Sequence, residues 1–335
     1  MTTPQISILM AVRNEERYLT AALRSLQRQT LSDWELVVID DGSTDATWRL
    51  LSSVAEFDRR IRPLQQPAHG LVTALTLGLE HCRAPLIARM DGDDLCHPQR
   101  LQQQCEYLRH HSEVDVVTCG IRHFPARLIT TGMRAYEDWL NSLYGHDEIL
   151  RDLYVEAPLV QPSVMLRRRA LDAAGGYQDN GWSEDYDLWL RLAQNGARFA
   201  RLPQTLFFWR DHPQRITRTS PGCTLAAFRA CRLHYLRRDY LRSADRVTLW
   251  GAGTEGKAWQ RLLKNNDIAV QRWIEVDTRK IGQTIHNAPV DPPETLKPGC
   301  GPMLITIGVR AARALVRQHC AERGLIEGID YVCVT

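Results

Sequence analysis

Three acidic side chains occur within four residues, Asp91-Gly92-Asp93-Asp94, directly after the apolar run Leu86 to Met90. Such crowding is unfavourable unless a cation or basic groups neutralise it, and hard oxygen ligands suit Mg²⁺ or Mn²⁺. A divalent ion on Asp91 and Asp93 could bridge to a diphosphate and stabilise it as a leaving group. The alternative is a solvated acidic turn, which is the commoner explanation of an isolated D-x-D pair.

Acidic residues also follow two other apolar runs. Asp40-Asp41-Gly42-Ser43 comes after the run Trp34 to Ile39, and Arg13-Asn14-Glu15 comes after the run Ile6 to Val12. If these runs are parallel strands, ligands bind beyond their carboxyl ends, where all three acidic stretches meet. One of the two aspartates could serve a helix cap, and the other could accept the N–H of a pyrimidine ring.

A fourth acidic stretch, Ser183 to Asp187, begins a helical pattern. Ser183 is predicted to cap the helix, and Asp185 precedes the apolar face by helical spacing, so it points toward the core side. Partial desolvation raises the proton affinity of such a carboxylate while the helix N-terminus keeps it ionised, which suits a general base. The alternative is an acid that only satisfies backbone N–H groups.

Basic residues accompany the acidic stretches. Arg89 and Arg100 flank the first cluster, where they could neutralise charge or contact phosphate. Arg210 and His212 follow the apolar run Leu206 to Trp209, and either could reach a diphosphate or a metal ion. A solvated surface histidine is the alternative for His212.

The elements that must position these residues follow from the alternation of apolar runs with helical patterns. Repeated strand–helix units predict an α/β fold with a mostly parallel sheet flanked by helices on both faces. The stretch from residue 120 to 162 shows few turn signals, and only a helix around 136–144 is predicted there. The expected strands before residue 120 are 6–12, 34–39, 61–64, 86–90 and 114–119, and the expected helices are 15–29, 46–57, one from 71, and 98–109.

A second strand–helix–strand pattern begins near residue 244. It carries Gly251, Gly253 and Gly256 between a strand and a helix, with Asp277 after the next strand, which is the context of a dinucleotide fingerprint. The pattern predicts a small Rossmann-like domain. Because the segment is shorter than a full dinucleotide domain, docking or oligomerisation is the stronger expectation and NAD(P) binding the weaker one. The expected domains are 1–215 for catalysis, 216–243 as a basic helical linker and 244–335 as the Rossmann-like domain.

The composition is that of an ordinary globular protein. The 335 residues are 44% hydrophobic and 24% charged, and the net charge of +3 is too small to argue for a nucleic-acid partner. No apolar run approaches the roughly 18 residues of a membrane span, and Met1 to Gln5 lack the start of a signal peptide. Nine cysteines without a C-x-x-C pair argue against a zinc site and for a reducing compartment. A cytoplasmic protein is expected.

Four segments in this order resemble family 2 glycosyltransferases of the glycosyltransferase A fold. The match covers roughly residues 5–215, and its segments are 6–15, 37–45, 89–94 with Pro98, Arg100, Leu101 and Gln104 behind it, and 183–191. Ala11-Val12-Arg13 departs from the residues that the family often has there. No Q-x-x-R-W signature of processive members is present, which favours a single addition.

The resemblance implies an inverting hexosyl transfer from a nucleotide diphosphate sugar, with a UDP-sugar favoured, to a glycan or lipid-linked acceptor in surface polysaccharide or lipopolysaccharide synthesis. Mg²⁺ or Mn²⁺ would be bound by Asp91 and Asp93, with His212 as a further candidate, and Asp185 would be the catalytic base. Glu184 would orient a loop or a sugar hydroxyl. The residues expected to bind the nucleotide or sugar are Ala11, Arg13, Glu15, Asp40, Asp41, Gly70, Arg89, Asp91, Glu184 and Arg210.

Other functions remain open at this point. A nucleotidyltransferase also uses carboxylate-held metal, but residues 10–17 contain no glycine or lysine for a phosphate loop. A nucleotide- or NAD(P)-sensing protein with a degenerate transferase domain would not need the acids at 91, 93 and 185. The basic helix near 223–242 could lie on an anionic membrane at the inner face of the plasma membrane, with a solvated interdomain helix as the alternative.

Overall fold

The computed structural model describes residues 3–335 and divides into two compact units. The first unit contains the residues up to 149 together with 158–220, and the second contains 150–157 and 221–335. Met1 and Thr2, which belong to the stretch considered above for a signal peptide, lie outside the described residues. In the part that is described, no helix is both long and apolar enough to cross a membrane.

The first unit is built on one mixed sheet of eight strands in the order β3-β2-β1-β4-β7-β6-β8-β5. Strands β1 to β4 are parallel, β7 is antiparallel to both β4 and β6, and β8 is parallel to β6 but antiparallel to β5. The fold class expected from the sequence is confirmed, with antiparallel additions that it did not foresee. The strands are β1 (Ile6–Val12), β2 (Trp34–Asp41), β3 (Ile61–Gln66), β4 (Leu86–Arg89), β5 (Leu95–Cys96), β6 (Val116–Phe124), β7 (Met165–Arg167) and β8 (Phe199–Arg210).

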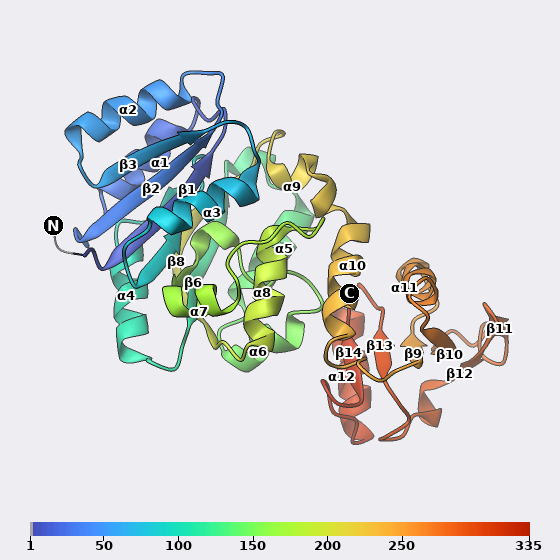
Figure 1. Cartoon of the computed structure of the whole chain (residues 1–335). Helices are drawn as coiled ribbons and strands as arrows, with labels where there is room; N and C mark the ends of the chain where they lie inside the picture. Colours follow the sequence, from blue (N-terminus) through green and yellow to red (C-terminus); the bar gives the residue numbers. More distant parts are fainter. Residues whose placement is uncertain (1–2) are drawn as a thin grey trace. The chain divides into compact units, whose positions relative to one another are not determined.

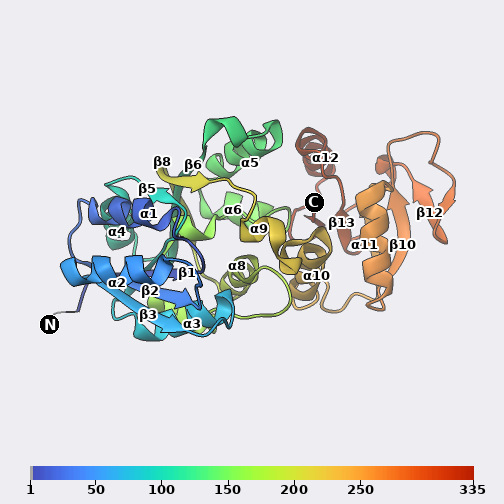
Figure 2. The same ribbon diagram turned by 90° about the horizontal axis from the view of Figure 1, so that it is seen from above.

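Helices cover both faces of this sheet, as Figures 1 and 2 show for α1 and α4 on one side and α3 on the other. Helix α3 packs closely on β1, because a Cβ at Gly78 would lie 2.4 Å from Leu9 Cδ1. A larger residue at 78 would therefore push the helix off the strand. The helices of the unit are α1 (Leu19–Gln27), α2 (Thr47–Phe57), α3 (Leu71–His81), α4 (Arg100–His110), α5 (Thr131–Asn141), α6 (His146–Asp152, which continues into the second unit), α7 (Arg168–Ala173), α8 (Glu184–Gln194) and α9 (Ile216–Thr219).

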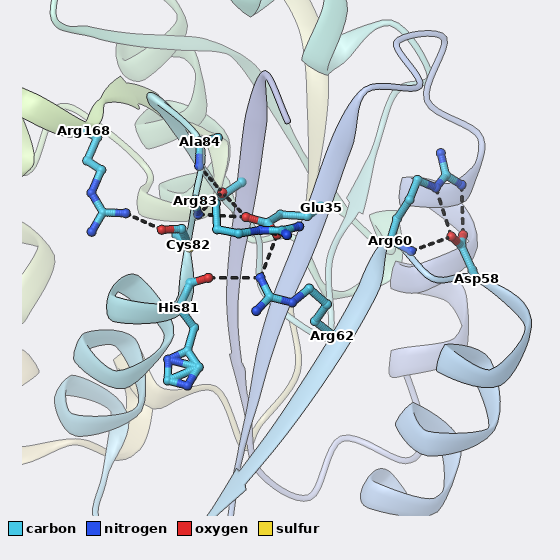
Figure 3. A network of polar contacts seen from close by, with 10 residues as sticks. Glu35, Asp58, Arg60, Arg62, His81, Cys82, Arg83, Ala84 and Arg168 are labelled. Carbon is cyan, nitrogen blue, oxygen red and sulfur yellow. Dashed lines mark hydrogen bonds and ion pairs between the residues drawn. The ribbon is translucent and has the colours of Figure 1, made fainter. Parts of the chain in front are cut away.

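The amino ends of β1 and β2 are joined by a buried carboxylate (Figure 3). Glu35 accepts hydrogen bonds from Ser7 Oγ at 2.7 Å, from the Arg83 backbone N–H at 2.8 Å and from Arg62 Nη1 at 2.7 Å. Its side chain is 3% exposed, so the carboxylate depends on these donors for solvation. The network fixes one end of the sheet and leaves the carboxyl ends free for a site.

The second unit is a smaller α/β structure with a sheet in the order β11-β12-β10-β9-β13-β14, parallel except for β11 with β12. Leu233 and Leu236 of the basic helix lie in its core. They belong to the stretch near 223–242 that could lie on a membrane, and their burial makes them unavailable to one, whereas Leu225 of the same helix is exposed. The elements are α10 (Leu225–Leu236), β9 (Arg246–Trp250), α11 (Thr254–Lys264), β10 (Ala269–Ile274), β11 (Thr284–Ile285), β12 (Ala288–Asp291), β13 (Met303–Ile305), α12 (Arg310–Glu322) and β14 (Tyr331–Cys333).

Candidate active site

The loops after β1 and β2 are hydrogen-bonded to each other at the carboxyl edge of the sheet. Asn14 takes a positive φ of 56°, so that its backbone N–H meets Ser43 Oγ at 2.9 Å and its side chain accepts from the Thr44 N–H at 2.8 Å. The Glu15 N–H donates to Thr47 Oγ1 at 2.8 Å. These bonds hold the Glu15 side chain over the edge where the acidic stretches were expected to meet.

The two aspartates after β2 differ in their partners. Asp41 accepts hydrogen bonds from Gln66 Nε2 and from the backbone N–H groups of His69 and Gly70 at 2.7–2.9 Å, so its carboxylate anchors the loop before α3. Asp40 accepts from the Ser43 N–H and from Gln65 Nε2 at 3.1 and 3.0 Å. Both carboxylates are buried and have internal partners.

The loop after β4 brings three carboxylates together. One oxygen each of Asp91, Asp93 and Asp94 can lie within 4.8 Å of the others, which is a spacing that one cation can span. Glycine is required between them, because a Cβ at Gly92 would lie 2.7 Å from Val12 Cγ1. The close approach of β1 therefore leaves no room for a side chain at position 92.

Arg89 is a buried cation beneath this cluster. Its guanidinium donates to Asp91 Oδ1 at 2.6 Å, to Gln161 Oε1 at 2.9 Å and to the Leu9 carbonyl at 2.7 Å. Arg100 is equally buried and donates to the Arg89 carbonyl at 2.8 Å, so it supports the strand and does not face the site. Of the two arginines that flank the cluster, only Arg89 contacts an acid of the cluster directly.

Residues at the end of β8 contact the acidic cluster after β4. The Arg210 backbone N–H donates to Asp94 Oδ1 at 2.6 Å, and its side chain donates to the Asp93 carbonyl at 2.5 Å and lies 4.5 Å from the centre of the Tyr18 ring. His212 Nε2 lies 2.9 Å from Asp93 Oδ2, while its Nδ1 has no partner among the described residues. Arg210 and His212 are thus brought to the acidic cluster.

The pKa values of Glu15, Asp93 and Asp94 are raised. Burial raises the pKa of Glu15 to about 8, and the nearby charges of Asp93 and Asp91 add to the effect. Burial and the neighbouring acids also raise the pKa of Asp93 and of Asp94. Buried and mutually repelling carboxylates with an unpartnered oxygen, Asp94 Oδ2, fit a divalent cation, because its charge would relieve the repulsion.

Helix α8 begins with the two acids Glu184 and Asp185. Ser183 does not cap this helix through its side chain, contrary to expectation; its hydroxyl instead donates to Asp185 Oδ1 at 2.5 Å. Asp185 also accepts from the Tyr186 N–H at 2.6 Å. Burial raises the pKa of Asp185, and burial with the Asp185 charge raises that of Glu184 to about 8. The charges of Arg89 and Asp91 affect the pKa of both carboxyl groups, so the α8 acids lie near the β4 cluster.

The remaining expected residues lie at the edges of this arrangement. Ala11 is half-buried, Arg13 is exposed, and Gly70 adopts a φ of 96° with open space around its Cα. The sequence analysis included Asp94 in the acidic cluster but did not name it as a metal ligand, whereas the structure groups its carboxylate with those of Asp91 and Asp93. It also did not single out Gln161, which lies in the stretch from 120 to 162 with few turn signals, or Tyr177, which follows that stretch.

The glycine turn of the second unit, residues 251–256, is tightly packed and hydrogen-bonded to Glu275 of the same unit. Gly251 and Gly256 pack so tightly that a Cβ on Gly256 would lie 1.9 Å from the Gly251 oxygen, whereas Gly253 has open space. The Ala252 N–H donates to Glu275 Oε1 at 2.9 Å, and Lys280 binds the same oxygen at 2.8 Å. Asp277, the acid expected here, pairs with Arg279 instead.

Comparison with known proteins identifies the family. The model "Glycosyl transferase family 2" matches residues 7–175, which include the β1, β2 and β4 ends. This chain belongs to glycosyl transferase family 2. The matched region excludes α8 and residues 221–335 of the second unit, but it includes residues 150–157 of that unit.

Related glycosyltransferases serve in bacterial polysaccharide synthesis. The amylovoran biosynthesis glycosyltransferase AmsE of Erwinia amylovora is 32% identical over 206 residues, covering 60% of this chain and 74% of AmsE. The O-antigen biosynthesis glycosyltransferase WbnJ of Escherichia coli is 30% identical over 210 residues, covering 62% and 80%. In fold, this glycosyltransferase is similar to S. aureus TarS 1-349 in complex with UDP-GlcNAc, with a TM-score of 0.55 and 16% identity over 78% of this chain and 80% of the other.

Proposed function

We propose that this glycosyltransferase transfers a single hexose, with inversion, from a UDP-sugar to a glycan or lipid-linked acceptor in surface polysaccharide synthesis. The observation that carries the proposal is the pairing of the Asp91–Asp93–Asp94 cluster with the two acids that begin α8. Support for the donor comes from the UDP-GlcNAc bound to TarS, and support for the pathway from the printed roles of AmsE and WbnJ.

Each part of the site has a role in this transfer. Asp91 and Asp93 would hold Mg²⁺ or Mn²⁺, which supplies positive charge for a departing diphosphate when it is bound. Arg210 extends its guanidinium to the same loop and can contact a phosphate oxygen. Asp40 and the end of β1 are proposed to contact the nucleobase. His212 stays a further candidate ligand, through Nδ1.

Asp185 is proposed as the base. Its raised pKa gives it proton affinity, while the bonds from Ser183 and the Tyr186 N–H favour the ionised form and fix its position. In the reaction Asp185 takes the proton of the acceptor hydroxyl as that oxygen attacks the anomeric carbon, and the bond from that carbon to the diphosphate oxygen breaks. A single displacement of this kind inverts the configuration.

The second unit carries no proposal of NAD(P) binding. Glu275 occupies the Ala252 N–H, one of the turn donors that a dinucleotide phosphate would need, and places a negative charge there. A role in docking or in joining copies of the chain stays a proposal for this unit.

A thermal-shift titration tests the proposed function. The protein is titrated with UDP, GDP and dTDP, each with Mn²⁺ or with a chelator, beside an Asp93→Asn variant. A ligand at 100 times its dissociation constant adds about 2.7 kcal/mol of stability. We expect stabilisation by UDP that needs metal and is lost in the variant; stabilisation by GDP or dTDP alone would overturn the donor assignment. Proton NMR of the product from an α-linked UDP-sugar then tests inversion, which requires a β-product.

A further inference from the structure

Three buried polar groups beside the acidic cluster lack hydrogen-bond partners among the described residues. They are Gln161 Nε2, the Tyr177 hydroxyl and Arg89 Nε. The three residues are 5%, 6% and 0% exposed, so bulk water does not solvate them. A buried polar group without a partner costs about 1–3 kcal/mol. Three such groups around one site indicate a ligand that supplies the missing partners.

Gln161 is held in one orientation. A guanidinium can only donate, so the 2.9 Å contact with Arg89 fixes the amide oxygen on that side and turns Nε2 away from it. The short helix that carries it, Gln161–Ser163, is tied to the sheet by a 2.6 Å bond between Ser163 Oγ and Thr118 Oγ1. The free N–H groups of Gln161 are thus preorganised.

The backbone next to Tyr177 is also held in place. It follows Gly176, whose carbonyl accepts a 2.8 Å bond from Arg191, and Arg191 is itself fixed by Asp187 at 2.6 Å. Burial raises the pKa of Tyr177, and among charged groups Arg89 and Glu184 affect it most. Its hydroxyl therefore lies in the region bounded by Arg89 and the α8 acids.

We infer that Gln161 and Tyr177 bind hydroxyl groups of the donor sugar and determine which sugar is accepted. This inference rests on the proposed function. In a single displacement the sugar ring lies between the diphosphate and the base. Gln161 contacts Arg89, which binds Asp91, and Tyr177 lies near Arg89 and Glu184, so both residues adjoin the acids of β4 and α8. The occupant is neutral, because both the Arg89 cation and the Asp91 carboxylate border the region, so a charged group of either sign would meet a like charge.

The chemistry of the two side chains suits sugar recognition. The Gln161 amide can only donate at Nε2, whereas the Tyr177 phenol can donate or accept. A hydroxyl satisfies both, and the direction of a sugar hydroxyl differs between epimers such as glucose and galactose. A site built to bond a hydroxyl rejects an analogue that lacks it, because the buried partner is then left unpaired.

The test compares UDP-glucose, UDP-galactose, UDP-GlcNAc and UDP-GalNAc by the release of UDP with water as the acceptor. The variants are Tyr177→Phe, which removes one hydroxyl, and Gln161→Glu, which keeps the oxygen that faces Arg89 but loses the free N–H groups. Tyr107→Phe is the matched control, because Tyr107 lies in α4 and its ring stacks on His111, which is not a residue of the candidate site. Inhibition by UDP alone is measured in parallel.

We expect each variant to lower kcat/KM for the preferred UDP-sugar about tenfold and to reduce its preference over the epimer at least fivefold. Inhibition by UDP should stay within twofold of the wild-type value, and the control should match the wild type. Equal losses for all four sugars, or no loss, would overturn the inference and assign the unpartnered groups to buried water. If UDP binds with Mn²⁺ but the wild type discriminates among no sugars, the inference fails alone. If no nucleotide binds, the proposed function fails with it.

Discussion

At the scale of single residues, Asp185 offers the sharpest test of the chemistry. Asp185→Asn keeps the shape of the side chain and an oxygen for the Ser183 hydroxyl, but an amide cannot take a proton. We expect kcat to fall about 10³-fold, within the usual contribution of a general base, while metal-dependent stabilisation by UDP is retained. Turnover and thermal shift measured on the same preparation check this. Near-normal turnover would remove Asp185 from the role of base.

Glu15 gives the site a pH dependence. Its pKa of about 8 means that the carboxyl is mostly protonated below that pH, when no cation is present. A cation on Asp91 and Asp93 would favour the ionised form and release this proton, so Mn²⁺ affinity should rise as the pH increases from 6 toward 8. Calorimetric titrations at several pH values measure the slope. Glu15→Gln has no proton to release at this position and should reduce the slope, while the other carboxyls with raised pKa values still contribute to it; an equal slope in both proteins would contradict the prediction.

At the scale of elements, Glu35 controls the stability of the sheet. Its hydrogen bonds with Arg83, Ser7 and Arg62 outweigh the effect of burial and lower the pKa of this carboxyl below the ordinary value of 4.5. A lowered pKa means that the stabilisation is complete above about pH 4.5 and is lost as the pH falls through the folded-state pKa.

Glu35→Gln should therefore lower the free energy of unfolding by about 2 kcal/mol at pH 7 and by less near pH 3. The loss of stability is no larger because Arg62 and Arg83 are 35% and 43% exposed, so water can solvate them once the Glu35 charge is removed. Denaturant unfolding at both pH values measures the difference, with Glu113→Gln as a surface control. UDP binding should not change, since the network lies at the opposite strand ends. A larger loss at pH 3 would contradict the assignment.

The sequence predicted the elements whose patterns are local. Strand Ile6–Val12 and helix Leu71–His81 are continuous apolar or amphipathic segments, and both were recovered. The helix expected from Glu15 begins only at Leu19, because the backbone N–H groups of Glu15 and Glu16 donate to the side chains of Thr47 and Asp45. The antiparallel strand β7 was missed, since its three residues carry no periodic signal and its pairing comes from distant parts of the chain.

In the candidate site, too, the sequence predicted the residues that follow local patterns and missed those that depend on tertiary contacts. The acids after strands were found because parallel strands bring their carboxyl ends together wherever they occur in the sequence. Gln161 and Tyr177 were not found, because only the tertiary fold reveals that a buried amide and phenol lack partners. The prediction of Asp277 as the acid at the glycine turn was limited for the same reason. Glu275, the first residue after β10, accepts the hydrogen bond from the turn instead.

At the scale of the whole molecule, the chain crosses between its two units more often than the sequence suggested. Residues 150–157 belong to the second unit, although the first unit resumes at 158. Val155 is 6% exposed within the core of the second unit, and Asp152 binds Arg317 of α12 at 2.6 Å. Gln161 follows this segment by only a few residues, so the second unit anchors the chain just before a residue of the proposed sugar site.

A chain that ends at residue 220 should consequently be a poor catalyst and a poorly soluble protein. Val155 and the partly buried Tyr154 would lose the core they pack against, and Asp152 would lose Arg317. Exposing a valine and part of a tyrosine costs about 3 kcal/mol, which lowers the melting temperature of a domain of this size by about 10 °C.

Val155→Ser separates loss of packing from other effects of truncation. In the truncated chain the substitution should improve solubility, because the position faces water there. In the full chain the same substitution should lower the melting temperature, because it places an unpartnered hydroxyl and a cavity in the second unit's core. Light scattering measures the solubility and thermal melts measure the melting temperature of the full and the truncated chain, each with and without Val155→Ser. The same sign in both backgrounds would mean that residues 150–157 do not depend on the second unit.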